Sequence, residues 1–278
     1  MVTLPESVVS RYERFSLYNS PYPAHDRGCA VDLYPGESGG PAPSPVAGRV
    51  LDTRTVDCPP REYAVDEDHL ILVDTGEYVA RVLHVDPGVE SGERVAVDDS
   101  LGTLVRSGFF GRWVDDHVHL GFRDPDANPY RASGSLPIEL DVDVTPLAWD
   151  GTGTVVETGL TYALLDAPTG GEGFAALASD EGVPLDGGLV HYTGGGALRP
   201  HDRSVSLLGC EVGTADGRGV SWADVAVRAN GARATGLSLF ASQVPFGAKL
   251  VFHEGHWFTV GDSVTVSVER TAEPTRLG

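Results

Sequence analysis

Two histidines lie one residue apart in the stretch DDHVHL, residues 115–120. Successive side chains of an extended strand point to opposite faces, so His117 and His119 share one face. Val118 and Leu120 share the other face, which is the pattern of a strand that packs against a core. Such a strand can carry solvated histidines on a half-exposed face, or it can contribute imidazoles to a metal site.

Other ionisable residues of the first half could join these two histidines. The stretch AHDRGCAVDLYPG contains His25 and Asp32, and YVARVLHVDPG places His84 at the end of an apolar strand. A catalytic zinc needs about three protein ligands, typically imidazole nitrogens and carboxylate oxygens, and one position left open for water. Histidines beside the metal can orient that water and stabilise the charge that grows on a carbonyl oxygen. The chain therefore holds enough residues of the right kind for a hydrolytic zinc site.

The order of these residues resembles the lysostaphin-type (LytM-like) zinc endopeptidases over about residues 25 to 123. That family has an early His…Asp pair, a histidine ahead of a V-x-x-G-x-x-V stretch, and then an H-x-H strand. Here they correspond to HDRGCAVD, LHVDPGVESGERV and DDHVHLGF. The resemblance implies an antiparallel β-sheet with a groove over the metal, and hydrolysis of peptide bonds in Gly-containing or peptidoglycan-like peptides. It assigns the roles as follows: Zn²⁺ held by His25, Asp32 and His119, with His84 and His117 as the catalytic histidines.

The spacing of the first ligand pair departs from the family, which usually separates its His and Asp by four positions. Here His25 and Asp32 are seven positions apart, and a regular strand would place them on opposite faces. We expect Gly28 to provide a turn or bulge that brings them together. Asp26 is the alternative ligand at this end of the site.

The segment before the H-x-H strand also differs from the family, because RSGFFGRWVDD replaces a small, Gly- and Thr-rich approach. The bulky side chains of Phe109, Phe110 and Trp113 are expected to reshape the groove. Asp115 shares a face with His117, so its carboxylate is a candidate hydrogen-bond partner for an imidazole.

The remaining sequence indicates a mostly-β protein. The chain has 35 Gly and 19 Pro, which favour frequent turns, and alternating or β-branched runs recur along it. HLILVDTGEYVARVLHV is typical of a hairpin that turns at Thr75 and Gly76. Helices are expected only at residues 5–15 and 172–180. We place a boundary near 144, with an antiparallel, barrel- or sandwich-like metallopeptidase domain in residues 1–144 and a β-rich domain of unknown role in 145–278.

The charge balance excludes some partners. There are 40 Asp and Glu against 20 Lys and Arg, a net charge of −20, and Lys249 is the only lysine. Such a charge strains a fold in dilute buffer, whereas at about 1 M salt the screening length falls to roughly 3 Å. We therefore expect a halophilic protein of a salt-rich cytoplasm, without affinity for nucleic acid. No signal peptide and no membrane-spanning stretch are expected.

A non-catalytic module is the alternative. SPVAGRVL and the V-x-x-G-x-x-V stretch also resemble the barrels of lipoyl and biotin carriers, but those attach their cofactor to a lysine between these strands, where this chain has none. An inactive peptidase-like module that binds peptide stays open. FHEGHWF, with His253 and His256, does not have the H-E-x-x-H spacing and predicts a turn.

Overall fold

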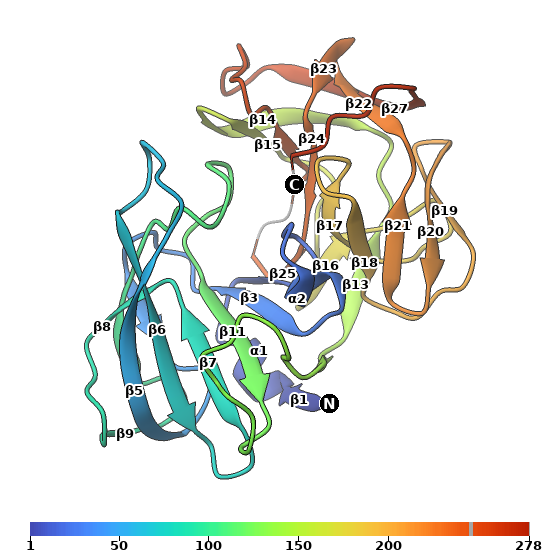
Figure 1. The fold of residues 1–278 in the computed structure, drawn as a ribbon. Helices are drawn as coiled ribbons and strands as arrows, with labels where there is room; N and C mark the ends of the chain where they lie inside the picture. Colours follow the sequence, from blue (N-terminus) through green and yellow to red (C-terminus); the bar gives the residue numbers. More distant parts are fainter. Residues whose placement is uncertain (245–246, 278) are drawn as a thin grey trace. The chain divides into compact units, whose positions relative to one another are not determined.

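The computed structural model describes residues 1–244 and 247–277, and it is built almost entirely of β-strands (Figure 1). The mostly-β fold class expected from the sequence is confirmed. The chain forms two compact units. The first comprises Met1–Phe15 and Arg27–Val142, and the second comprises Ser16–Asp26 and Asp143–Gly278. The short segment Ser16–Asp26 therefore groups with the C-terminal half of the chain.

The first unit is dominated by one sheet, in which the strands follow the order β2-β3-β11-β7-β6-β5-β9. The pairs from β3 to β9 are antiparallel. A smaller sheet has the order β4-β10-β8, and β1 pairs with β12 in parallel. The elements are α1 (Glu6–Val9), β1 (Val2–Pro5), β2 (Arg14–Ser16), β3 (Ala30–Tyr34), β4 (Pro41–Pro43), β5 (Gly48–Asp57), β6 (Glu67–Asp74), β7 (Val79–Leu83), β8 (Val85–Pro87), β9 (Arg94–Val95), β10 (Ser100–Leu104), β11 (Val118–Arg123) and β12 (Ile138–Asp141).

One face of this sheet carries a continuous row of buried apolar side chains. Val31, Ile71, Val82, Val118 and Leu120 are all completely buried. Burying such β-branched and aliphatic side chains on one side of a sheet is a main stabilising contribution, and it fixes the register, because a slip by one residue would turn the whole row to the other face.

The predicted hairpin is present as β6 and β7. The two strands pair from Asp74 opposite Val79 to Leu70 opposite Leu83. Gly76 has φ = 88°, which favours glycine, and the Thr75 N–H donates to the Tyr78 carbonyl at 3.0 Å.

Strand β11 lies between β3 and β7, as Figure 1 shows for these neighbouring arrows. His119 is opposite Asp32 on one side and opposite Leu83 on the other. Residues that are opposite one another in a ladder point to the same face. The pairing therefore sets Asp32 and His119 side by side on the face opposite to that of Val118 and Leu120.

The second unit has its own core and a long sheet with the order β19-β20-β21-β18-β17-β24-β26-β15-β14-β27-β22-β23. Strands β13, β16 and β25 also belong to this unit, with β16 between the other two. The elements are α2 (Pro23–Asp26), β13 (Val144–Leu147), β14 (Thr152–Gly159), β15 (Tyr162–Leu165), β16 (Phe174–Leu177), β17 (Leu185–Leu189), β18 (Gly194–Ala197), β19 (Ser204–Leu207), β20 (Cys210–Asp216), β21 (Gly219–Trp222), β22 (Val225–Ala229), β23 (Ala232–Ala234), β24 (Gly236–Leu239), β25 (Ala241–Ser242), β26 (Lys249–Val251) and β27 (Ser263–Arg270).

One predicted helix is wrong and the other is shorter than expected. Within residues 172–180 the structure has strand β16, which is buried along its length and pairs with β13 and β25. Pairing on both sides overrides the helical preference of its alanines and leucine. Within residues 5–15 only Glu6–Val9 is helical, and Arg14 already begins β2.

Among the described residues, none of the helices has the length and apolar character that crossing a membrane would require.

Candidate metal centre

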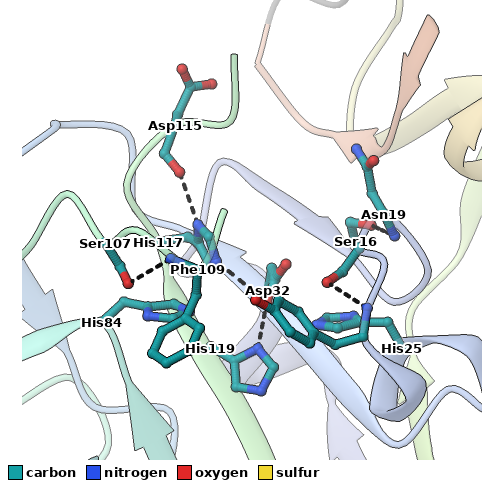
Figure 2. A network of polar contacts seen from close by, with 12 residues as sticks. Ser16, Asn19, His25, Asp32, His84, Ser107, Phe109, Asp115, His117 and His119 are labelled. Atoms are coloured by element: carbon teal, nitrogen blue, oxygen red, sulfur yellow. Dashed lines mark hydrogen bonds and ion pairs between the residues drawn. The ribbon is translucent and has the colours of Figure 1, made fainter. Parts of the chain in front are cut away.

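Asp32 and His119 form the fixed pair of the site. The β3–β11 register places His119 Nδ1 2.9 Å from Asp32 Oδ1. Asp32 is only 3% exposed, so its carboxylate is almost removed from water. Figure 2 shows both side chains directed toward one another, with His117 reaching the same carboxylate from above. A carboxylate in such a position is stabilised by positive charge, whether from a proton or from a metal ion.

His25 reaches the site by a route that differs from a regular strand. It lies on the short helix α2, and the chain then turns at Gly28, with φ = 59°, before β3 begins at Ala30. One nitrogen or oxygen atom each of His25, Asp32 and His119 lies within 4.8 Å of the other two. Asp26, the alternative ligand, is exposed and is not part of this group.

These three side chains suit a zinc ion. Two imidazole nitrogens and one carboxylate oxygen are the donor types that zinc prefers. Bonds of about 2.0–2.2 Å in a tetrahedral arrangement place ligand atoms roughly 3.3 Å apart, which is compatible with the 2.9 Å pair and the 4.8 Å limit of the group. Three protein ligands would also leave one position of a tetrahedral ion open.

A backbone carbonyl of its own segment orients His25. Its buried ring donates from Nδ1 to the Leu17 carbonyl at 2.9 Å, and a histidine held at Nδ1 binds a metal through Nε2. Leu17 is itself anchored, because its N–H donates to Asp186 Oδ2 at 2.6 Å and Ser16 Oγ donates to Asp186 Oδ1 at 2.5 Å. Burial raises the pKa of Asp186 to about 7, although these hydrogen bonds favour the carboxylate. Sequence reasoning did not identify Asp186, since nothing local links it to His25.

His84 is held by a buried carboxylate that the sequence analysis missed. His84 Nδ1 lies 2.6 Å from Asp68 Oδ2, and the His84 backbone N–H donates to Asp68 Oδ1 at 3.0 Å. Ser107 Oγ donates to the same carboxylate at 2.6 Å. Burial raises the pKa of Asp68, but His84 and Ser107 outweigh it and hold that pKa at about 2. The only signal in the sequence was an acidic residue directly before the apolar run HLILV.

His84 also has an unusual backbone, with φ = 68°. This left-handed conformation is uncommon for a residue other than glycine, and such residues gather at functional sites. The left-handed conformation of His84 follows directly after the end of β7 and turns the imidazole ring toward the other histidines. The ring centroid of His84 lies 5.0 Å from that of His117 and 5.6 Å from that of His119.

His117 is buried and oriented by a backbone carbonyl. Its Nδ1–H donates to the Asp115 carbonyl at 2.8 Å, and its Nε2 lies 3.4 Å from Asp32 Oδ1. Burial lowers the pKa of His117 to about 4, although Asp32 acts in the opposite direction. The expected contact through the Asp115 carboxylate is wrong, because that carboxylate pairs with Arg14 at 2.8 Å.

Aromatic side chains from the segment before β11 pack on His84 and His117. The ring of Phe110 lies 4.7 Å from His117 and 5.2 Å from His84, and Phe109 lies 6.3 Å from His84. Trp113 is buried. These rings line one side of the site with apolar surface, which lowers the local dielectric constant and strengthens the electrostatic interactions beside it.

The histidines of the C-terminal FHEGHWF stretch have structural roles. His256 Nε2 lies 2.8 Å from the carbonyls of both Gly159 and Tyr162. His253 Nδ1 contacts Thr235 Oγ1 at 2.8 Å. Both rings connect a loop to neighbouring strands. The three cysteines, Cys29, Cys58 and Cys210, are all free thiols.

Comparison with known proteins identifies the family. Residues 3–140 match the N-terminal domain of DUF8155, a domain of unknown function, and residues 145–269 match the C-terminal domain of DUF8155. The two matches together span most of the chain, which therefore belongs to the DUF8155 family. No curated protein matches it.

Two solved structures show a distant likeness. One is a mutant of the catalytic domain of the prophage-encoded M23 protein EnpA from Enterococcus faecalis, 18% identical over 38% of this chain and 78% of that chain, with a TM-score of 0.28. The other is LytU, 24% identical over 36% of this chain and 63% of LytU, with a TM-score of 0.27.

Proposed function

We propose that this protein is a zinc-dependent hydrolase, an endopeptidase that cleaves Gly-containing or related peptides, with zinc held by His25, Asp32 and His119. The observation that carries the proposal is the grouping of these three ligand atoms within 4.8 Å, with the ring of His84 beside His119 and the ring of His117 beside Asp32. A zinc ion there would supply Lewis-acid activation of a water molecule and of the peptide carbonyl. The resemblance to lysostaphin-type enzymes supports the same assignment of roles.

His117 is suited to accept a proton. Because its Nδ1–H is donated to the Asp115 carbonyl, Nε2 carries the lone pair on the side of Asp32. A pKa of about 4 keeps the ring neutral at neutral pH, so the ring can take up a proton during the reaction. Its fixed tautomer means that no reorientation has to precede the transfer.

His84 is suited to stabilise negative charge that develops on the peptide carbonyl oxygen. The ionised Asp68 keeps a proton on Nδ1 and stabilises positive charge on the ring. Nε2 can then donate a hydrogen bond to the oxygen that gains charge. The left-handed backbone at His84 and the Ser107–Asp68 hydrogen bond fix the direction of that donor.

Metal content tests the proposal. The full-length chain, purified in molar salt, should carry about one zinc per chain. His119→Ala should remove most of it, because a two-ligand site binds zinc far more weakly. His201→Ala, which changes a histidine of the second unit outside the site, is the matched control and should keep its zinc. Equal zinc in the unmodified protein and in His119→Ala would contradict the proposal.

Cleavage tests the reaction separately. A glycine-rich peptide library should be cut in molar salt, and a chelator should abolish the cleavage. If the protein binds these peptides with the same affinity in the presence of a chelator and cuts none of them, the alternative of an inactive peptide-binding module is favoured.

We also propose that the protein acts in a salt-rich cytoplasm. The net charge of −20 supports this location.

A further inference from the structure

Two arginines lie on the same sheet face as His119. Along β11, His119, Gly121 and Arg123 alternate onto one face, and on β7 the residue opposite Gly121 is Arg81. Arg81 is 8% exposed and Arg123 is 1% exposed. Both side chains are therefore largely buried a short distance along the strands from the candidate metal ligands.

Neither charge is neutralised within the part of the chain that the structure describes. The Nε atoms of both arginines are buried and have no hydrogen-bond partner, and neither guanidinium forms an ion pair with a described residue. This is unusual in a chain with 40 acidic residues, where Arg14 and Arg106 of the same unit do pair with aspartates. A buried charge without a counter-charge is costly, and proteins seldom keep one unless a ligand compensates it.

The two arginines differ in their surroundings. The terminal nitrogens of Arg123 donate to the Ser135 hydroxyl and to the Arg131 carbonyl, the latter at 2.8 Å. Arg123 thus supports the loop of residues 124–137, which packs over Gly121: a Cβ added there would lie 3.4 Å from Ser135 Oγ. Arg81 has no such contact to the loop, and it keeps some accessible surface.

The charges also influence one another. Burial, together with the positive charge of Arg123, lowers the pKa of Arg81 to about 10. Arg81 therefore stays protonated at neutral pH, and the two guanidinium groups create a local region of positive potential in an otherwise acidic protein. A planar guanidinium suits a carboxylate especially well, because it can donate two parallel hydrogen bonds.

We propose that Arg81, supported by Arg123, binds a carboxylate of the substrate peptide. The inference rests on the proposed function, because it names the substrate class for the same site. Arg81 lies two positions along β7 from Leu83, the residue opposite His119, which corresponds to about 7 Å at roughly 3.3 Å per residue. An extended peptide with its scissile bond at the metal centre would thus place a carboxylate about two residues away at Arg81. Acidic peptides, rather than purely glycine-rich ones, are then the preferred substrates.

Binding without turnover tests this proposal. The probes are the peptides Gly-Gly-Gly-Gly-Glu and Gly-Gly-Gly-Gly-Gln, each as a free acid and as a C-terminal amide. Affinity for the chelator-treated full-length chain is measured by calorimetry in molar salt. We expect the unmodified protein to bind the charged peptides about tenfold more tightly than the neutral amide of the Gln peptide. If replacing Glu by Gln weakens binding and amidation does not, Arg81 binds a side-chain carboxylate. If amidation weakens binding and the replacement of Glu does not, Arg81 binds the C-terminal carboxylate.

Arg81→Gln should remove this preference and bind all four peptides alike. Arg228→Gln, which removes an exposed arginine of the second unit paired with Glu269, is the matched control and should keep the preference. Arg81→Lys keeps the positive charge but removes the planar guanidinium group, so it should reduce the preference severalfold. This variant provides a second test should Arg81→Gln not fold. Equal binding of charged and neutral peptides by the unmodified protein would overturn the proposal, as would an unchanged preference in the folded Arg81→Gln variant. Because the measurement needs no metal, its result is independent of whether the chain hydrolyses peptides.

Discussion

Three histidines of the site are held through the same ring atom. Nδ1 of His25 and of His117 faces a backbone carbonyl, and Nδ1 of His84 faces a carboxylate. In each case the partner fixes the tautomer and the ring orientation, and Nε2 is the ring nitrogen that points away from that partner. His119 differs, since its Nδ1 faces Asp32. At the residue scale, the partners of the histidines therefore determine the chemistry as much as the histidines do.

Asp68→Asn tests this at His84. An amide cannot stabilise positive charge on the ring, so we expect kcat/KM for peptide cleavage to fall roughly 10- to 100-fold while zinc content is unchanged. Asp66→Asn, two residues earlier and exposed, is the matched control and should behave as the unmodified protein. A loss of zinc that parallels the loss of activity would show that Asp68 supports the metal instead of His84.

At the element scale, the segment Ser16–Asp26 is the part of the chain that carries His25. It groups with the second unit, and its first residues are anchored on Asp186 of β17. Asp186 is fully buried, so the anchor consists of a carboxylate that is costly to ionise. This anchor fixes the position of Leu17, whose carbonyl accepts the hydrogen bond from the ring of His25.

The raised pKa of Asp186 predicts a pH dependence of stability. An aspartate in the unfolded chain releases its proton near pH 3.8, whereas Asp186 in the folded chain holds it up to about pH 7. Between these values the folded state binds one more proton, so the free energy of unfolding falls as the pH rises from about 4 to about 7, by up to about 4 kcal/mol.

Asp186→Asn should lose this contribution to the slope, because asparagine does not titrate in this range. Urea unfolding at several pH values between about 4 and 8, in molar salt, measures the difference from the unmodified protein. Asp216→Asn, an exposed aspartate of the same unit, is the control and should keep the slope. Identical slopes for all three proteins would contradict the assignment.

At the scale of the whole molecule, the net charge of −20 is the dominant property. Acidic residues are spread along the whole chain, so the repulsion is general. Raising ionic strength from about 0.1 M to about 1 M shortens the screening length from roughly 10 Å to roughly 3 Å. Repulsion between surface carboxylates is then largely removed, while hydrophobic burial in the two units is retained.

We therefore expect the melting temperature to rise by several degrees between about 0.1 M and 1 M KCl. Differential scanning calorimetry at a series of salt concentrations measures it. Repeating the series near pH 4.6, the isoelectric point, provides the control, because with little net charge the rise should be smaller. A melting temperature that is insensitive to KCl at neutral pH would argue against adaptation to high salt.

Much of the fold was predictable because alternation is a local property. The two faces of β11, with His119 on one and Val118 and Leu120 on the other, follow from the two-residue period of a strand. The turn at Gly76 follows in the same way from a residue that tolerates positive φ. The strand at Phe174–Leu177 was not predictable in this way, since four small or apolar residues suit a helix equally well until two partner strands flank them.

For the candidate site, too, some features were predictable from the sequence and others depend on the tertiary structure. The sequence by itself determined which residues could bind a metal and in which order they occur, because residue type and short-range spacing are written directly in it. Only the tertiary structure placed His25 within 4.8 Å of Asp32 across a seven-residue separation, and only it joined Asp68 to His84 and Asp186 to Leu17. The physical reason is that these contacts depend on strand pairings and turns between residues far apart in the chain, whose free energies are decided by the packing of the whole unit and not by any local pattern.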